Sequence, residues 1–135
     1  VGRLVDVDPA KEFAVVVLRS DDGQEIPIAG GRFVVEGRDC EFSLVVGDSL
    51  QGQGIGRRIL KALMYEASRR GLNKIMGYVL TENLAMIALG QSLKFELLDS
   101  DEGPSVQCLA RQLPRLHVGI LEKMVRRLRN RQLKI

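Results

Sequence analysis

The pattern of apolar positions along the first third of the chain predicts three strands joined by short turns. Phe13–Leu18 is continuous and β-branched, as in a buried strand. Asp21–Gln24 has the composition of a hairpin turn. Further strands are expected over Ile26–Val35, with a bulge or bend at Gly30-Gly31, and over Cys40–Val46. These strands read as an antiparallel meander.

The apolar spacing then changes from that of strands to that of helices. Gly56–Arg70 repeats apolar residues at helical intervals with charged residues opposite, and Gly71 suits a left-handed cap that ends a helix. Lys74–Leu80 predicts a strand, and Thr81 is expected to N-cap a second helix over Glu82–Leu93. The strand-helix-strand order implies a right-handed parallel crossover.

The sequence of the last part of the core predicts two short strands, followed by a domain boundary. They are expected over Phe95–Leu98 and Val106–Leu109, separated by an acidic turn, and Pro114 closes the core. The predicted class is α/β, a mixed and mostly antiparallel sheet with a central parallel β-α-β crossover. Residues 1–113 form one domain, and residues 114–135 a basic amphipathic C-terminal helix.

Charge and composition limit the classes of molecule that the chain is expected to bind. Residues 116–135 carry six Lys and Arg against one Glu, so the positive formal net charge of +3 comes from this segment and the rest of the chain is close to neutral. A helix docked on the domain, or on a second subunit as a homodimer contact, is favoured over nucleic acid, because aromatic residues for base stacking are absent from this segment. No apolar run approaches the length needed to cross a bilayer, so no membrane partner is expected.

Cysteine and histidine usage excludes several kinds of site. Cys40, Cys108 and His117 do not have the spacing of a metal site, so no metal is expected. A Ser-His-Asp triad is disfavoured by the single histidine. Two cysteines far apart in sequence are typical of reduced core residues in a cytoplasmic protein.

The glycine-rich turn within Ser43–Leu60, "SLVVGDSLQGQGIGRRIL", predicts an anion site. A P-loop needs Lys-Ser/Thr after its last glycine, where this chain has Arg57-Arg58. A dinucleotide fingerprint needs a third glycine at position 57 and an acidic residue ending the next strand, and both are missing. The remaining pattern is Gln-x-x-Gly-x-Gly, formed by Gln51, Gly54 and Gly56. Its small residues let backbone N–H groups approach an anion at the positive end of the following helix.

This motif, with a strand before it and a helix after it, resembles the GNAT superfamily of acyl-CoA-dependent N-acetyltransferases. Cys40–Leu97 is most similar to the GNAT domain of bacterial protein-lysine acetyltransferases, which is often fused to an NDP-forming acyl-CoA-synthetase-like region. The resemblance covers about residues 3–113. It implies acetyl-CoA as cosubstrate, no metal, and an amine acceptor that is a protein lysine.

The resemblance also assigns residues to the cosubstrate. Backbone groups of Leu44, Val45 and Val46 would pair with the amides of pantetheine like an added strand. Asn83 would bond pantetheine or its neighbours, with an equal alternative that it satisfies free donors at a helix start. The pyrophosphate of coenzyme A would lie on the loop and its flanking arginines, which comprise Gln51, Gly52, Gln53, Gly54, Ile55, Gly56, Arg57 and Arg58.

Glu41 is the expected catalytic residue. A protonated amine must lose a proton before it attacks a thioester, and the resembling lysine acetyltransferases use a glutamate at this position as general base. Desolvation by Cys40 and Phe42 is expected to raise the pKa of Glu41 into the useful range. The alternative is an exposed surface carboxylate.

Two departures from the family pattern bear on activity. Gly90 occupies the position where many members carry a tyrosine that protonates the thiolate, and Lys94 replaces a glycine. Thiolate release would then use water, backbone N–H groups or Ser92, while Tyr65 and Tyr78 are expected to be packing residues. The strand and two helices that begin most members are missing, so a partner chain or domain completes the acceptor site, or the chain is partial.

Three functions remain open on the sequence. The first is transfer of an acetyl group from acetyl-CoA to a primary amine, most consistent with a protein lysine. The second is acetylation of a small amine, because a fold does not fix the acceptor. The third is a non-catalytic acyl-CoA-binding or interaction module, which the missing helices and the absent tyrosine favour.

Overall fold

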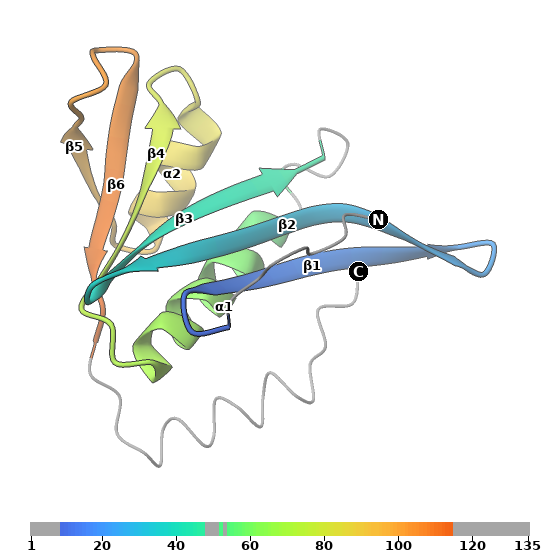
Figure 1. The fold of residues 1–135 in the computed structure, drawn as a ribbon. Coiled ribbons are helices and arrows are strands. Elements are labelled where there is room, and N and C mark those ends of the chain that lie inside the picture. Colours follow the sequence, from blue (N-terminus) through green and yellow to red (C-terminus); the bar gives the residue numbers. More distant parts are fainter. Residues whose placement is uncertain (1–8, 48–51, 53, 115–135) are drawn as a thin grey trace.

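A six-stranded mixed sheet organises the protein (Figure 1). The computed structural model describes residues 9–47, 52 and 54–114. The strands follow the order β1-β2-β3-β4-β6-β5, and the one parallel pair joins β3 to β4. This confirms the predicted α/β class. The strands are β1 (Glu12–Asp21), β2 (Gln24–Glu36), β3 (Asp39–Val46), β4 (Lys74–Leu80), β5 (Glu96–Asp99) and β6 (Val106–Gln112).

In the described part of the chain, two helices pack on the sheet and bury the core (Figure 1). Helix α1 (Ile55–Arg69) contacts β1, β2 and β3, and helix α2 (Leu84–Ser92) contacts β5. Neither is long and apolar enough to cross a membrane, within the described residues. The fully buried side chains between helix and sheet include Phe33, Ile59, Leu60, Leu63, Ile75 and Leu109.

Helix α1 ends as its sequence predicts. Gly71 has φ +76°, its N–H donates to Ser68 O at 3.0 Å, and the N–H of Leu72 donates to Ala67 O at 3.1 Å. These two bonds form a Schellman motif, which satisfies carbonyls that the helix leaves free. Arg70, which follows the helix, donates to Pro9 O at 2.9 Å and so ties this end of α1 to the chain before β1.

The glycine pair in β2 is not the bulge that the sequence suggested. Gly30 and Gly31 pair in register with Val16 and Val15, and the irregularity lies next to Val17 instead. A Cβ on Gly31 would collide with the Ile59 side chain of α1. Gly31 therefore lets α1 lie close to the sheet, a requirement set by tertiary packing that local sequence does not reveal.

Helix α2 begins two residues later than predicted, and its cap is Asn83 rather than Thr81. The Asn83 side chain accepts a hydrogen bond from Met86 N at 3.1 Å. The Thr81 hydroxyl instead donates to Pro104 O at 2.8 Å, which ties the turn before α2 to the turn between β5 and β6. Both residues are candidate caps, and Asn83 is the stronger of the two.

The C-terminal helix predicted for residues 114–135 and its homodimer contact lie outside the described residues, apart from Pro114.

Lys94 follows α2 with φ +67°, a left-handed conformation that costs a residue with a Cβ about 1–2 kcal/mol. Lys94→Gly is therefore expected to raise the free energy of unfolding by about 0.5–1 kcal/mol, after the entropy that glycine loses on folding is subtracted. Lys61→Gly, at an exposed position inside α1, is the matched control and should lower it by about 1 kcal/mol. Urea unfolding of the three proteins measures both changes. Equal destabilisation by the two glycines would contradict the account of Lys94.

Candidate active site

A cavity of about 630 Å³ lies where β3 and β4 separate. The parallel pairing joins Asp39 to Lys74, Cys40 to Ile75 and Glu41 to Met76, and ends there. The chain segments that line the cavity are the end of β3, the glycine turn with the start of α1, and one side of α2. Its lining residues are Leu44, Val45, Val46, Gly52, Gly54, Ile55, Gly56, Arg57, Asn83, Ala85, Met86, Ala88, Leu89 and Ser92.

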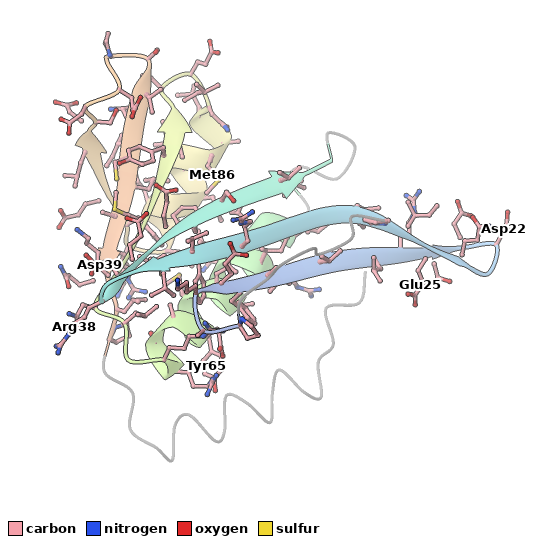
Figure 2. The ribbon with its side chains drawn as sticks, viewed as in Figure 1. Asp22, Glu25, Arg38, Asp39, Tyr65 and Met86 are labelled. Atoms are coloured by element: carbon pink, nitrogen blue, oxygen red, sulfur yellow. The ribbon has the colours of Figure 1, made fainter. Side chains whose placement is uncertain are left out.

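A second hollow, of about 790 Å³, lies at the other end of the sheet. Figure 2 shows Arg38 and Asp39 there, at the turn between β2 and β3. Asp39 is within 3.9 Å of Lys74, which also borders this hollow. Its described lining includes the C-terminal end of α1 and no helix N-terminus, so among the described residues it lacks a feature that the sequence predicted for a coenzyme site.

The edge of β3 presents backbone groups to the first cavity in alternation. The N–H of Gly47 donates to Ile28 O of β2 at 3.1 Å, so the odd-numbered residues of β3 direct their backbone groups to β2. Leu44 and Val46 therefore direct theirs to the opposite side, where β4 no longer pairs. This corrects the prediction for Val45, whose backbone groups face Gly30.

Two glycines in the turn adopt conformations that other residues avoid. Gly52 has φ +85° and Gly54 has φ +78°, and a Cβ on either would meet nothing within 4 Å. Backbone conformation, rather than space, is what requires glycine at these positions. Gly56 differs, because its Cβ would lie 3.2 Å from the side chain of Leu89 on α2. Gln51 and Gln53 lie outside the described residues.

The N-terminus of α1 opens into the cavity, and no side chain among the described residues caps it. Gly54 is the N-cap residue and offers no side-chain acceptor, and the first turn contains no acidic residue. The first intrahelical bond runs from Arg58 N to Gly54 O, so the N–H groups of residues 55–57 have no acceptor within the helix. Free N–H groups and the positive end of the helix dipole favour an anion here.

The two arginines that follow the turn differ in position. Arg57 lines the cavity, and its Nη1 donates to Ser92 Oγ at 2.9 Å. Arg58 is exposed and is not among the described lining residues of the cavity, so its assignment to the pyrophosphate stays a prediction.

Asn83 lines the cavity and also caps α2. Its side-chain oxygen accepts from Met86 N, which is the structural alternative that the sequence left open. The side-chain amide group keeps two N–H donors, so the cap does not exclude a second role toward a ligand. Figure 2 shows Met86 on α2 facing the space between β4 and β3.

Glu41 lies at the last paired position before the strands separate. Its side chain is exposed, whereas Cys40 and Phe42 are buried on the side of the sheet that carries the helices. Successive side chains of a strand point to opposite faces, so these neighbours do not desolvate Glu41 as predicted.

Tyr78 and Glu41 are electrostatically coupled. Tyr78 is 49% exposed and does not belong to the core, contrary to prediction, while Tyr65 is buried as expected. Partial desolvation raises the pKa of Tyr78, and repulsion from the Cys108 thiolate, once that group ionises, and from the Glu41 carboxylate raises it further. The phenol therefore stays protonated at neutral pH.

Other groups proposed for thiolate release or acyl transfer are occupied or buried. Ser92 Oγ donates to Leu89 O at 2.7 Å, so its hydrogen is already used. A Cβ on Gly90 would lie 2.6 Å from Leu109 Cδ1, which shows how closely α2 packs on β6. Both cysteines are buried, as predicted, and burial raises the pKa of Cys40 to about 12. A protonated thiol is a poor nucleophile.

The described residues contain no cluster of acidic, histidine or cysteine side chains that would hold a metal ion.

Sequence reasoning missed the contribution of α2 beyond Asn83. The spacing of its cavity-lining residues places them on one side of a helix, which is a usable signal. Apolar residues surround α2 on all sides, however, so its pattern does not show which side faces a ligand. The missed positions are Ala85, Met86, Ala88 and Leu89, while Ser92 was considered only for thiolate release.

Comparisons with known proteins agree with this geometry. The sequence pattern of the acetyltransferase (GNAT) family matches residues 5–95. Acetyltransferase Pat of Mycolicibacterium smegmatis is 38% identical over 86 residues, which are 62% of this chain and 25% of that protein. The chain therefore spans about a quarter of the length of this relative.

Solved structures share the fold. A cAMP-binding acyltransferase from Mycobacterium smegmatis superposes with a TM-score of 0.68 at 27% identity, covering 88% of this chain and 38% of that one. The PaiA N-acetyltransferase from Thermoplasma acidophilum, in complex with coenzyme A, gives 0.64 at 14% identity, covering 76% and 61%. The fold, the glycine turn and the match over residues 5–95 together show that this chain belongs to the acetyltransferase (GNAT) family.

Proposed function

We propose that this chain binds acetyl-CoA in the cavity between β3 and β4 and transfers its acetyl group to a primary amine, a protein lysine in the first instance. The observation that carries the proposal is the unpaired edge of β3, which leads directly to the uncapped N-terminus of α1. A ligand with amides at one end and a pyrophosphate at the other matches this succession of groups. Coenzyme A is such a ligand.

The path of the ligand follows from the order of the site's parts. The pyrophosphate takes the N–H groups at residues 55–57 and the charge of Arg57, since these favour an anion. Pantetheine then runs back along β3 and pairs with Leu44 and Val46, as a strand adds to a sheet edge. This direction brings the thioester toward the point where β3 and β4 separate, next to Glu41.

The reaction needs little from the protein beyond placement and proton removal. Glu41, directly or through water, takes a proton from the acceptor ammonium, and the neutral amine attacks the thioester carbon. The new C–N bond forms as the C–S bond breaks, and the proton that the nitrogen loses on becoming an amide passes through water to the leaving thiolate. The exposure of Glu41 gives an acceptor access from solvent.

The resemblance of Cys40–Leu97 to bacterial protein-lysine acetyltransferases favours a protein acceptor. Acetyltransferase Pat is 38% identical over 86 residues of the chain. A small amine remains the alternative acceptor, and an acyl-CoA-binding module without activity is the alternative function. Activity measurements on the chain with a lysine peptide and with a free small amine distinguish these three.

Gly54→Glu tests the binding site. A carboxylate placed at the N-terminus of α1 occupies the anion site and repels the pyrophosphate, so the Kd for acetyl-CoA should rise about a hundredfold or more. Gly23→Glu is the matched control, because Gly23 has the same φ of +78° and equally open surroundings at the turn between β1 and β2. Figure 2 shows its neighbour Asp22 at the tip of that hairpin, far from α2. Titration calorimetry that gives both variants wild-type affinity would refute this location.

Glu41→Gln tests catalysis separately from binding. Loss of a general base should lower kcat for a lysine peptide by about 10²–10⁴-fold at neutral pH, with partial recovery at alkaline pH where the amine is neutral unaided. The Kd for acetyl-CoA should not change. Glu96→Gln, at an exposed strand position on β5, is the control for loss of one negative charge. If thiol release by Glu41→Gln keeps its wild-type rate at neutral pH, Glu41 is not the base.

A further inference from the structure

A hydrogen bond joins the start of one helix to the end of the other across the cavity. Arg57 is the third residue of α1, and Ser92 is the last residue of α2. Arg57 Nη1 donates to Ser92 Oγ at 2.9 Å, and Ser92 Oγ in turn donates to Leu89 O at 2.7 Å. The second bond fixes the direction of the hydroxyl hydrogen, so a lone pair of Ser92 faces the guanidinium.

The charge of Arg57 is not neutralised by the described part of the chain. Other arginines there form ion pairs, as Arg69 and Arg70 do with Glu66. Among the described residues, no carboxylate lies within ion-pair distance of Arg57, whose recorded partner is the neutral Ser92. The last carbonyls of α2 also favour a cation at this place.

We infer that Ser92 is a positioning residue. It holds the Arg57 guanidinium next to the N-terminus of α1, where the guanidinium contacts the phosphate groups of coenzyme A. The inference rests on the proposed function, because it needs coenzyme A in this cavity. It assigns a role to a residue at the far end of α2, thirty-five positions from Arg57 in the chain.

The physical reason lies in the cost of ordering an arginine. A long side chain that is mobile in the free protein loses rotamer freedom when it binds a ligand. A side chain that a hydrogen bond already orders before binding loses less. The bond to Ser92 uses one of the five N–H donors of a guanidinium, which leaves the others for phosphate oxygens. Ser92 can therefore orient Arg57 without consuming its capacity to bind.

The competing explanation is that Ser92 only stabilises the C-terminal end of α2. That role would affect stability, and its effect on ligand binding would not depend on Arg57. The two explanations differ in this dependence, which a double-mutant cycle measures.

The experiment is titration calorimetry of coenzyme A against the wild type, Ser92→Ala, Arg57→Ala and the double variant. Ser92→Ala should weaken binding about two- to tenfold. It should cause no further loss in the Arg57→Ala background. Ser92→Thr keeps the hydroxyl and should keep the wild-type Kd. With a lysine peptide, Ser92→Ala should raise the KM for acetyl-CoA and leave kcat unchanged.

The outcomes separate this inference from the proposed function. Wild-type affinity in Ser92→Ala, or an equal loss with and without Arg57, would overturn the role of Ser92 and leave the coenzyme site intact. Absence of coenzyme A binding by the folded wild-type chain would overturn both. Should Ser92→Ala fail to fold, Ser92→Cys replaces it in the same cycle, because a thiol has nearly the shape of the hydroxyl and accepts hydrogen bonds weakly.

Discussion

The end of hydrogen bonding between β3 and β4 is the constraint on which the rest of the site depends. Backbone N–H and C=O groups need partners, and a strand edge without a neighbouring strand offers a row of them. Pairing stops at Glu41 and Met76, so the later residues of β3 face a cavity. The ring of Phe42 packs at this point against Gly77, where a Cβ would lie 2.6 Å from it, and edge-on to Phe95. Aromatic packing thus fills the base of the space between the separating strands.

The position of α1 turns this free edge into a complete site. Gly31 allows α1 to lie close to the sheet, and Gly52 and Gly54 allow the chain to turn from the end of β3 into the helix. Within the described residues, the N-terminus of α1 and the unpaired residues of β3 therefore line one cavity. The unpaired backbone amide groups of β3 and the positive end of the α1 helix dipole therefore lie one after the other along the cavity. No single side chain creates this arrangement, so the proposed binding of coenzyme A would rest mainly on backbone and glycine positions.

Local sequence signals predicted the parts of the fold that local interactions form. The turn before β2, the helix α1 with its Gly71 cap, and the glycine turn all depend on residues close in sequence. Tertiary contacts decided the features that were missed. Asn83 is the stronger of the two candidate caps, and the Thr81 hydroxyl is bonded to Pro104 instead of capping the helix. Gly31 marks a close approach of two elements and not a bulge.

The candidate site also has one part that local sequence predicts and another that tertiary packing decides. The glycine turn and the end of β3 were predictable because the motif is contiguous, whereas the side of α2 that lines the cavity was not. Two errors arose from neglecting strand alternation. Glu41 does not share a face with Cys40 and Phe42, and Val45 does not share an edge with Leu44 and Val46. Alternation follows from strand geometry alone, so both errors were avoidable.

The measurement that tests the central claim most directly is residue-resolved amide hydrogen exchange along β3, with and without saturating coenzyme A. In the free protein, the N–H of Val45 faces β2 and should exchange slowly, while those of Leu44 and Val46 should exchange fast. The account predicts that coenzyme A slows Leu44 and Val46 and leaves the hairpin of β1 and β2 unchanged. Unchanged exchange at Leu44 and Val46 in the saturated complex would contradict it.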